Sequence, residues 1–215
     1  MSSGSSQCPQ WKEYPYITKG TVGGFVGFNL IVCGGSHINS DECYFVTPQK
    51  IEFLAEMSVK RKNAASLVIG GKYLWVSGGN NVYTLSSTEF IETKAMPGPE
   101  LPTALEGHKM IDITDDLTLF IGGKDASGGV VTATFYFDHN RTHYEIGQWS
   151  FGPTMQYRRK NHAVGVVTDR TTLKKLVVVT GGVGEEGSAM TSEILSEDLW
   201  SKGDIAYRNL LKVIR

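Results

Sequence analysis

Residues 74–79 read Leu-Trp-Val-Ser-Gly-Gly, an apolar, strand-like run that ends in a glycine doublet. Three further apolar runs end the same way, at Gly34-Gly35, Gly122-Gly123 and Gly181-Gly182. The first glycines of successive doublets are 44, 44 and 59 residues apart. Self-similarity at roughly 40 to 50 residues is typical of propellers and solenoids, in which each repeat buries its faces only against its neighbours. The sequence therefore predicts a repeat protein.

Each repeat contains the same succession of segments. A strand of small residues comes first, and the apolar strand with its doublet follows. A polar loop then leads to a third strand, such as residues 88–91, and a fourth segment closes the repeat. Runs rich in Val, Ile, Phe and Tyr that are broken by Gly, Asn, Asp and Pro favour an all-β meander of four-stranded sheets. The longer third period is explained by two longer hairpin loops, at residues 138–144 and 169–175.

These features resemble the kelch repeat: a glycine doublet after an apolar strand, an aromatic residue on the next strand and a later tryptophan. The likeness is greatest in the fourth repeat, where Ile194 and Trp200 are six residues apart. It covers about residues 20–203, and residues 87–91, 98–102 and 158–163 also look like kelch segments. It implies a β-propeller of about four four-stranded blades. Three alternatives stay open: a fragment, a natural truncation, or a small propeller closed by pairing its two ends.

The resemblance also divides the chain. Residues 1–10 are expected to be a flexible leader, and residues 11–203 are expected to form the blades. Residues 204–215 are expected to be a C-terminal tail or the start of a further blade. If the arrangement is open, two apolar blade faces are exposed, and we expect them to favour self-association.

Composition excludes several classes of function. With 21 Lys+Arg against 22 Asp+Glu and a net charge of -1, the chain has no basic field for nucleic acid. The longest aliphatic run, residues 176–179, is far shorter than a membrane span, so no membrane contact is expected. The N-terminus lacks the pattern of a secretory signal, which favours a cytoplasmic location, or a secreted one if the true N-terminus is missing.

Of the three cysteines, Cys33 and Cys43 are expected on neighbouring antiparallel strands, whereas Cys8 lies in the leader. Whether the pair is directly opposed depends on the register, which the intervening loop hides. We expect the two residues to be offset and to remain free thiols, because nothing at the N-terminus directs export.

No motif indicates catalysis or a cofactor. Residues 182–187 match the GxGxxG pattern, but they occupy the position of the other glycine turns and carry two carboxylates, so we interpret them as a turn. His139 and His143 lie in a hairpin loop, where their spacing does not create a metal site. The alternative of a sugar-acting enzyme would place His108, His162 and Glu106 at the channel mouth. A further alternative is a truncated fragment with no function of its own.

Two basic loops distinguish this sequence. Residues 60–63 and 158–161 occupy the same repeat position, ahead of the first strand, and propeller symmetry would place them on one rim. Arginine suits carboxylate recognition, so we predict a non-enzymatic module that binds an acidic protein or peptide. The candidate binding residues are Arg61, Lys62, Asn63, Asn80, Arg158, Arg159, Lys160 and Asn161. The alternative is that one arginine per repeat has a structural role.

Overall fold

The structure is a computed structural model that describes residues 19–37, 40–140, 143–169, 172–185, 187–188 and 191–202. Within these residues the chain is entirely β-structure and irregular loops, so the predicted all-β class is confirmed. None of the described segments forms a helix that could cross a membrane. The expected leader (1–10) and tail (204–215) lie outside the described residues.

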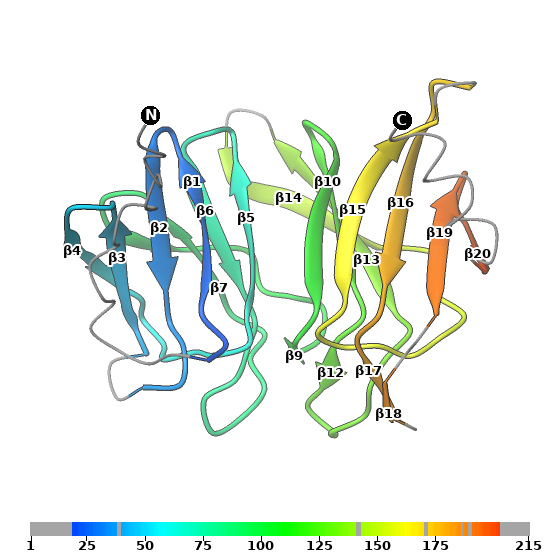
Figure 1. Ribbon diagram of the computed structural model, residues 1–215, viewed down its shortest axis with the longest axis horizontal. Helices are drawn as coiled ribbons and strands as arrows, with labels where there is room; N and C mark the ends of the chain where they lie inside the picture. The colour runs from blue at the N-terminus through cyan, green and yellow to red at the C-terminus, as the bar shows by residue number, and fades with distance from the viewer. Residues whose placement is uncertain are drawn as a thin grey trace, which may run out of the picture.

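Four four-stranded antiparallel sheets follow one another along the chain, and they are called units 1 to 4 (Figure 1). Unit 1 comprises β1 (Val22–Val26), β2 (Asn29–Cys33), β3 (Glu42–Val46) and β4 (Ile51–Glu56). Unit 2 comprises β5 (Ala65–Ile69), β6 (Tyr73–Ser77), β7 (Thr88–Ile91) and β8 (Ala95–Pro97). Unit 3 comprises β10 (Lys109–Thr114), β11 (Leu117–Ile121), β13 (Thr134–Asn140) and β14 (His143–Phe151). Unit 4 comprises β15 (Ala163–Thr168), β16 (Lys175–Thr180), β19 (Ser192–Ser196) and β20 (Leu199–Lys202).

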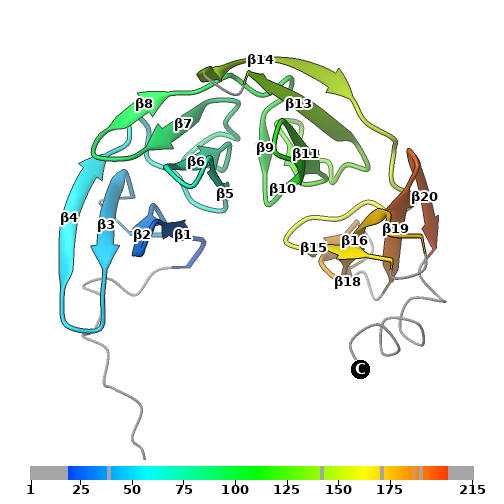
Figure 2. The ribbon, with the colours of Figure 1, turned by 90° about the horizontal axis from the view of Figure 1, so that it is seen from above.

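Two short pairings complete the topology. β9 (Leu105–Glu106) pairs with β12 (Lys124–Asp125), and β17 (Val183–Gly184) pairs with β18 (Gly187–Ser188). Seen from above, the units form an arc with the first strand of each unit on the inside and the fourth on the outside (Figure 2). The arrangement is therefore blade-like, and the described residues do not close a ring.

The glycine doublets fix how each unit meets the next. Gly78 and Gly79 have φ angles of 57° and 88°, a region that residues with a Cβ seldom adopt. The Gly79 N–H donates to the carbonyl oxygen of Leu105 at 2.8 Å, and a Cβ on Gly78 would clash with the same oxygen. Glycine recurs here because the chain leading into the next unit passes directly against the doublet.

The core consists of three apolar clusters, one between each pair of neighbouring units. Between units 1 and 2 it includes Ile31 and Leu74, and between units 3 and 4 it includes Leu119 and Val179. The middle cluster centres on Trp75, whose ring lies 5.2 Å from Phe120 and 5.3 Å from Phe137. Each sheet is thus buried mainly against its neighbours, as a repeat architecture requires.

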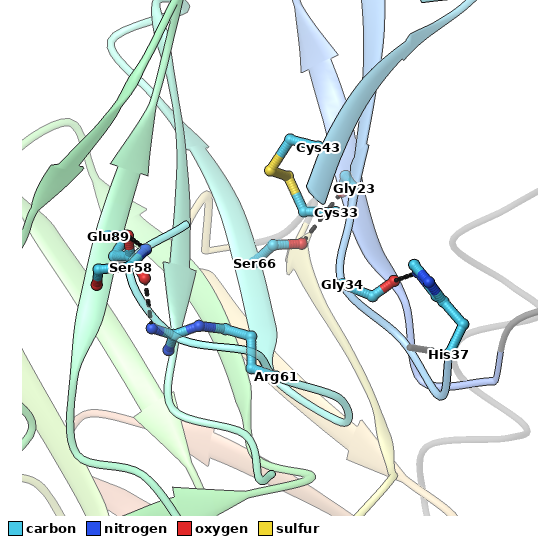
Figure 3. Close-up of a disulfide and its surroundings, with 9 residues drawn as sticks. All are labelled: Gly23, Cys33, Gly34, His37, Cys43, Ser58, Arg61, Ser66 and Glu89. Carbon is cyan, nitrogen blue, oxygen red and sulfur yellow. Dashed lines mark hydrogen bonds and ion pairs between the residues drawn. A yellow bond between two sulfur atoms is a disulfide. The ribbon is translucent and has the colours of Figure 1, made fainter. Parts of the chain in front are cut away.

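The structure corrects the prediction for the cysteines. Cys33 and Cys43 face each other directly in the register of β2 and β3, with Cα atoms 4.1 Å apart, and they form a disulfide (Figure 3). The expected offset was wrong because a main-chain hydrogen bond joins the two ends of the intervening loop. Gly34 N–H donates to Glu42 O at 3.1 Å, which brings the two cysteines opposite each other. Cys8 lies outside the described residues.

This disulfide predicts the thiol count of the protein. Unfolded under non-reducing conditions, the chain should titrate one free thiol, from Cys8, and reduction should raise the count to three. Titration with a chromogenic thiol reagent in denaturant, with and without prior reduction, measures both values. Three free thiols before reduction would contradict the assigned bridge.

Candidate partner-binding rim

Two sets of loops gather at one end of the sheets, the lower end in Figure 1, where β9, β12, β17 and β18 lie. The linker loops lead into the first strand of a unit and comprise residues 60–63, 104–107 and 158–161. The doublet loops follow the glycine doublets of units 2 to 4 and comprise residues 80–84, 124–130 and 183–185. Together these segments are called the rim.

Main-chain pairing holds each linker loop against a doublet loop. Lys62 N–H donates to Asn80 O at 2.9 Å, and Asn80 N–H returns a bond of 2.8 Å. Lys160 and Val183 form the equivalent pair at 3.0 and 2.9 Å. In unit 3 the pairing of β9 with β12 joins the same two loops. The same main-chain pairing of linker loop and doublet loop therefore occurs in units 2, 3 and 4.

A second series of main-chain bonds runs along the inside of the arc. Asn63 N–H donates to Gly20 O at 2.9 Å, Gly107 N–H to Asn63 O at 2.8 Å, and Asn161 N–H to Gly107 O at 2.7 Å. Asn63 and Asn161 have φ angles of 53° and 54°, which asparagine tolerates better than most residues. Their backbone therefore has a structural role, which the basic-loop pattern did not predict.

Arg61 and Arg159 do not lie at the surface as predicted, and this expectation is corrected. The two residues are 1% and 0% exposed. The Nη1 atom of Arg61 donates to the carbonyl oxygens of Gly78 and Ser87, both at 2.9 Å. Its Nη2 atom lies 2.7 Å from Glu89 Oε1 (Figure 3). Burial lowers the pKa of Arg61, and the neighbouring Glu89 carboxylate acts in the opposite direction. The guanidinium group thus joins the linker loop to the next sheet.

The same arrangement recurs at the junction of units 3 and 4. Arg159 Nη1 donates to the carbonyl oxygens of Gly181 and Thr191, and Nη2 lies 2.9 Å from Glu193 Oε1. The main-chain N–H of Gln156 donates to the other oxygen of Glu193 at 2.6 Å. The structural alternative considered for the repeated arginine is therefore the one observed.

The junction of units 2 and 3 replaces this ion pair with apolar side chains. Leu105 occupies the linker position of Arg61, since its carbonyl accepts the bond from the doublet glycine. On the third strand, Phe135 occupies the position of Glu89. Phe135 is paired with Phe120 and Glu89 with Val76, and both of these partners stand two residues before a glycine doublet. Leu105 and Phe135 belong to one buried cluster. The two partners of a junction therefore change together.

The other six predicted residues lie where solvent reaches them. Lys62, Asn63, Asn80 and Lys160 are half-buried, whereas Arg158 and Asn161 are exposed. Arg158 Nη1 donates to Val130 O at 2.9 Å and lies 3.2 Å from Glu185 Oε1. Glu185 therefore partly neutralises the charge of Arg158, while Glu186 lies outside the described residues.

Two exposed residues were missed by sequence reasoning. Val82 and Tyr83 are 80% and 77% exposed at the tip of the unit 2 doublet loop. The Asn81 Oδ1 atom accepts hydrogen bonds from both of their main-chain N–H groups, which fixes the turn. An apolar pair between polar loop residues was the available signal.

The residues of the enzymatic alternative are engaged in the junctions between units. His108 is fully buried, with Nε2 3.2 Å from Ser77 Oγ, and His162 is buried at the next junction. Burial is the main cause that lowers the pKa of each histidine to about 3. Glu106 lies 2.6 Å from Lys124 Nζ. These side chains do not converge on one exposed site.

The described part of the GxGxxG match, residues 182–185 and 187, forms the turn into β17, that strand and the start of β18, as interpreted. In the part of the chain that the structure describes, no group of three or more His, Cys, Asp or Glu side chains could hold a metal ion.

Comparison with known proteins supports the fold. No family model and no curated protein matches the sequence. Among solved structures, that of YjhT superposes with a TM-score of 0.71 and 14% sequence identity. The match covers 86% of this chain and 70% of YjhT. The chain thus shares with YjhT an all-β, propeller-like fold built of several antiparallel four-stranded sheets.

Proposed function

We propose that the chain is a kelch-type, non-enzymatic binding module whose rim contacts an acidic protein segment. The observation that carries the proposal is the position of Lys62 and Lys160. Each has its backbone fixed by a pair of main-chain bonds, and each side chain reaches solvent at the same place in its repeat. Pre-organised groups lose less conformational entropy when a partner binds.

The unit 2 doublet loop adds an apolar component to this surface. Asn80, which pairs with Lys62, directly precedes the fixed turn that presents Val82 and Tyr83. Tyrosine is enriched among the residues that dominate binding energy in protein interfaces. A partner segment with carboxylates beside an apolar group would complement both features.

The kelch assignment rests on the repeated doublets and on Trp200. Its ring is buried in unit 4, and Nε1 donates to Pro153 O at 2.8 Å, in the chain that leads into this unit. The tryptophan thus attaches the last strand to the preceding linker, which gives this repeat residue a physical role.

The Cys33–Cys43 disulfide bears on the compartment. Disulfides persist in oxidising surroundings and are rare in the cytosol. The bridge therefore favours the secreted or surface location over the cytoplasmic one expected from the N-terminal sequence.

A charge reversal tests the rim. The double variant Lys62→Glu/Lys160→Glu should bind acidic peptides on an array at least about tenfold more weakly than the wild type, because attraction becomes repulsion. The control is Lys50→Glu/Lys94→Glu, which makes the same charge change in the turns that follow the third strands of units 1 and 2, at the opposite end. If the rim variant bound the peptides as strongly as the control variant does, the rim assignment would be overturned. Wild-type protein that binds no peptide would favour a fragment without function.

A further inference from the structure

Unit 1 has a sheet face that no other unit covers. In β1, Val22 and Val26 pack against the cluster shared with unit 2. Because successive residues of a strand point to opposite faces, Phe25 points away from unit 2, and it is 65% exposed. Its register neighbour is Leu30, which is paired in turn with Val46. An apolar row therefore crosses this outer face.

At the other end of the arc, unit 4 has a face that none of the other described units covers (Figure 2). In β15, Val164 and Val166 pack against the cluster shared with unit 3. Gly165 therefore lies on the opposite face, where it is paired with Val178. A Cβ placed on Gly165 would have no atom of the described residues within 4 Å. This face thus combines an apolar surface with an open space at its inner strand.

The interior junction of units 1 and 2 shows what fills such a space. Gly24 occupies in β1 the register position of Gly165 in β15. A Cβ on Gly24 would lie 2.6 Å from Val68 Cγ2 and 3.0 Å from Leu74 Cδ1 of unit 2. A glycine on the first strand is therefore covered by a large apolar pair from the next unit.

The residues of unit 1 that correspond to this pair are Phe25 and Leu30. Counted from the start of the first strand, the fourth residue pair between the first and second strands is Val68 with Leu74 in unit 2. In unit 1 the fourth pair is Phe25 with Leu30. Both Phe25 and Leu30 lie on the uncovered face. Unit 1 thus carries the large side chains that the space at Gly165 would accept.

The glycine doublets also indicate that a further unit would fit against unit 4. At Gly34, Gly78 and Gly122 a Cβ would clash with the carbonyl of the linker residue entering the next unit. At Gly181 it would meet no atom within 4 Å in the part of the chain that the structure describes. The second glycines, Gly35, Gly79 and Gly123, donate to that carbonyl at 2.8–2.9 Å. For the Gly182 N–H no acceptor is found among the described residues.

We propose that the unit 4 face of one molecule binds the unit 1 face of a second copy, with Phe25 and Leu30 of the copy seated on Gly165. This contact continues the packing rule of the junctions inside the chain, which is why a second copy fits better than an unrelated surface. The two faces differ, so the contact is heterologous and joins molecules head to tail.

The mass of the protein in solution tests the proposal. Wild-type protein should increase in mass with concentration in sedimentation or light-scattering measurements. Phe25→Asp and Gly165→Arg should each remain monomeric. The control is Phe28→Asp, which introduces the same charge three residues away at a 103% exposed position in the β1–β2 turn and should associate like the wild type.

A mixing experiment separates loss of the contact from misfolding. Phe25→Asp retains an intact unit 4 face, and Gly165→Arg retains an intact unit 1 face. An equimolar mixture should therefore form a complex that stops at one copy of each variant. A monomeric wild type at every concentration, or association that both variants retain, would overturn the proposal. So would a mixture that remains monomeric while both variants are folded by circular dichroism.

Discussion

Glu89→Leu should lower the free energy of unfolding by about 3–5 kcal/mol, because it leaves the buried Arg61 guanidinium without its counter-charge. The main-chain N–H of Ser58 would also lose its acceptor, Glu89 Oε2, at 2.8 Å. Urea denaturation monitored by tryptophan fluorescence measures the change. The matched control is Glu52→Leu, which removes the carboxylate of the exposed Lys50–Glu52 pair and should cost less than about 1 kcal/mol.

The double variant Arg61→Leu/Glu89→Phe should recover most of this loss. It installs between units 1 and 2 the Leu–Phe combination that Leu105 and Phe135 provide between units 2 and 3. Well-packed apolar replacements of buried ion pairs are often neutral or stabilising. A double variant no more stable than Glu89→Leu would show that the two kinds of junction are not interchangeable.

The fold should begin to lose stability below about pH 6.5, a higher pH than that at which ordinary carboxylates titrate. The pKa of His108 and of His162 is about 3 in the folded protein and about 6.5 in the unfolded chain. The unfolded chain therefore binds more protons below pH 6.5. The stabilisation from the two neutral rings is complete above that pH and is lost progressively as the pH falls toward 3. At pH 5 the loss should be about 2 kcal/mol for each histidine.

His162→Leu isolates this effect. Neither ring nitrogen of His162 has a hydrogen-bond partner among the described residues, so the substitution breaks no such bond. The variant should match the wild type near pH 7.5 and lose about half as much histidine-linked stability at pH 5. Unfolding free energies measured from pH 7.5 to pH 5 test this, and parallel curves for the two proteins would contradict it.

The sequence predicted the order of strands because glycine doublets repeat where the backbone allows little else. Gly78 and Gly79 show the reason, since a side chain at the first would clash with the next unit. The register of Cys33 and Cys43 could not be predicted, because a loop of unknown shape separates them. That loop fixes which residues face each other.

The candidate site was predicted in position but not in side-chain direction. The loops at residues 60–63 and 158–161 do lie together on the rim, yet alternate residues within them point inward and outward. Arg61 reaches a carboxylate 28 residues further on, and Arg159 one that is 34 residues further on. Such partners become visible only when the sheets are placed side by side. In the third repeat Leu105 and Phe135 replace both the linker arginine and the strand glutamate, and this joint replacement was the one hint of the pairing.

The junction chemistry also restricts how such a chain can be rearranged by recombination. One half of each junction is carried on the linker leaving a unit, and the other half on the third strand of the unit that follows. If unit 3 were moved to follow unit 1 directly, Arg61 would meet Phe135, and a charge would be buried against a ring. Duplicated or shuffled repeats would therefore be tolerated only when the linker residue and the third-strand residue of a junction are exchanged together. The residue pair at each junction thus restricts which unit can follow which.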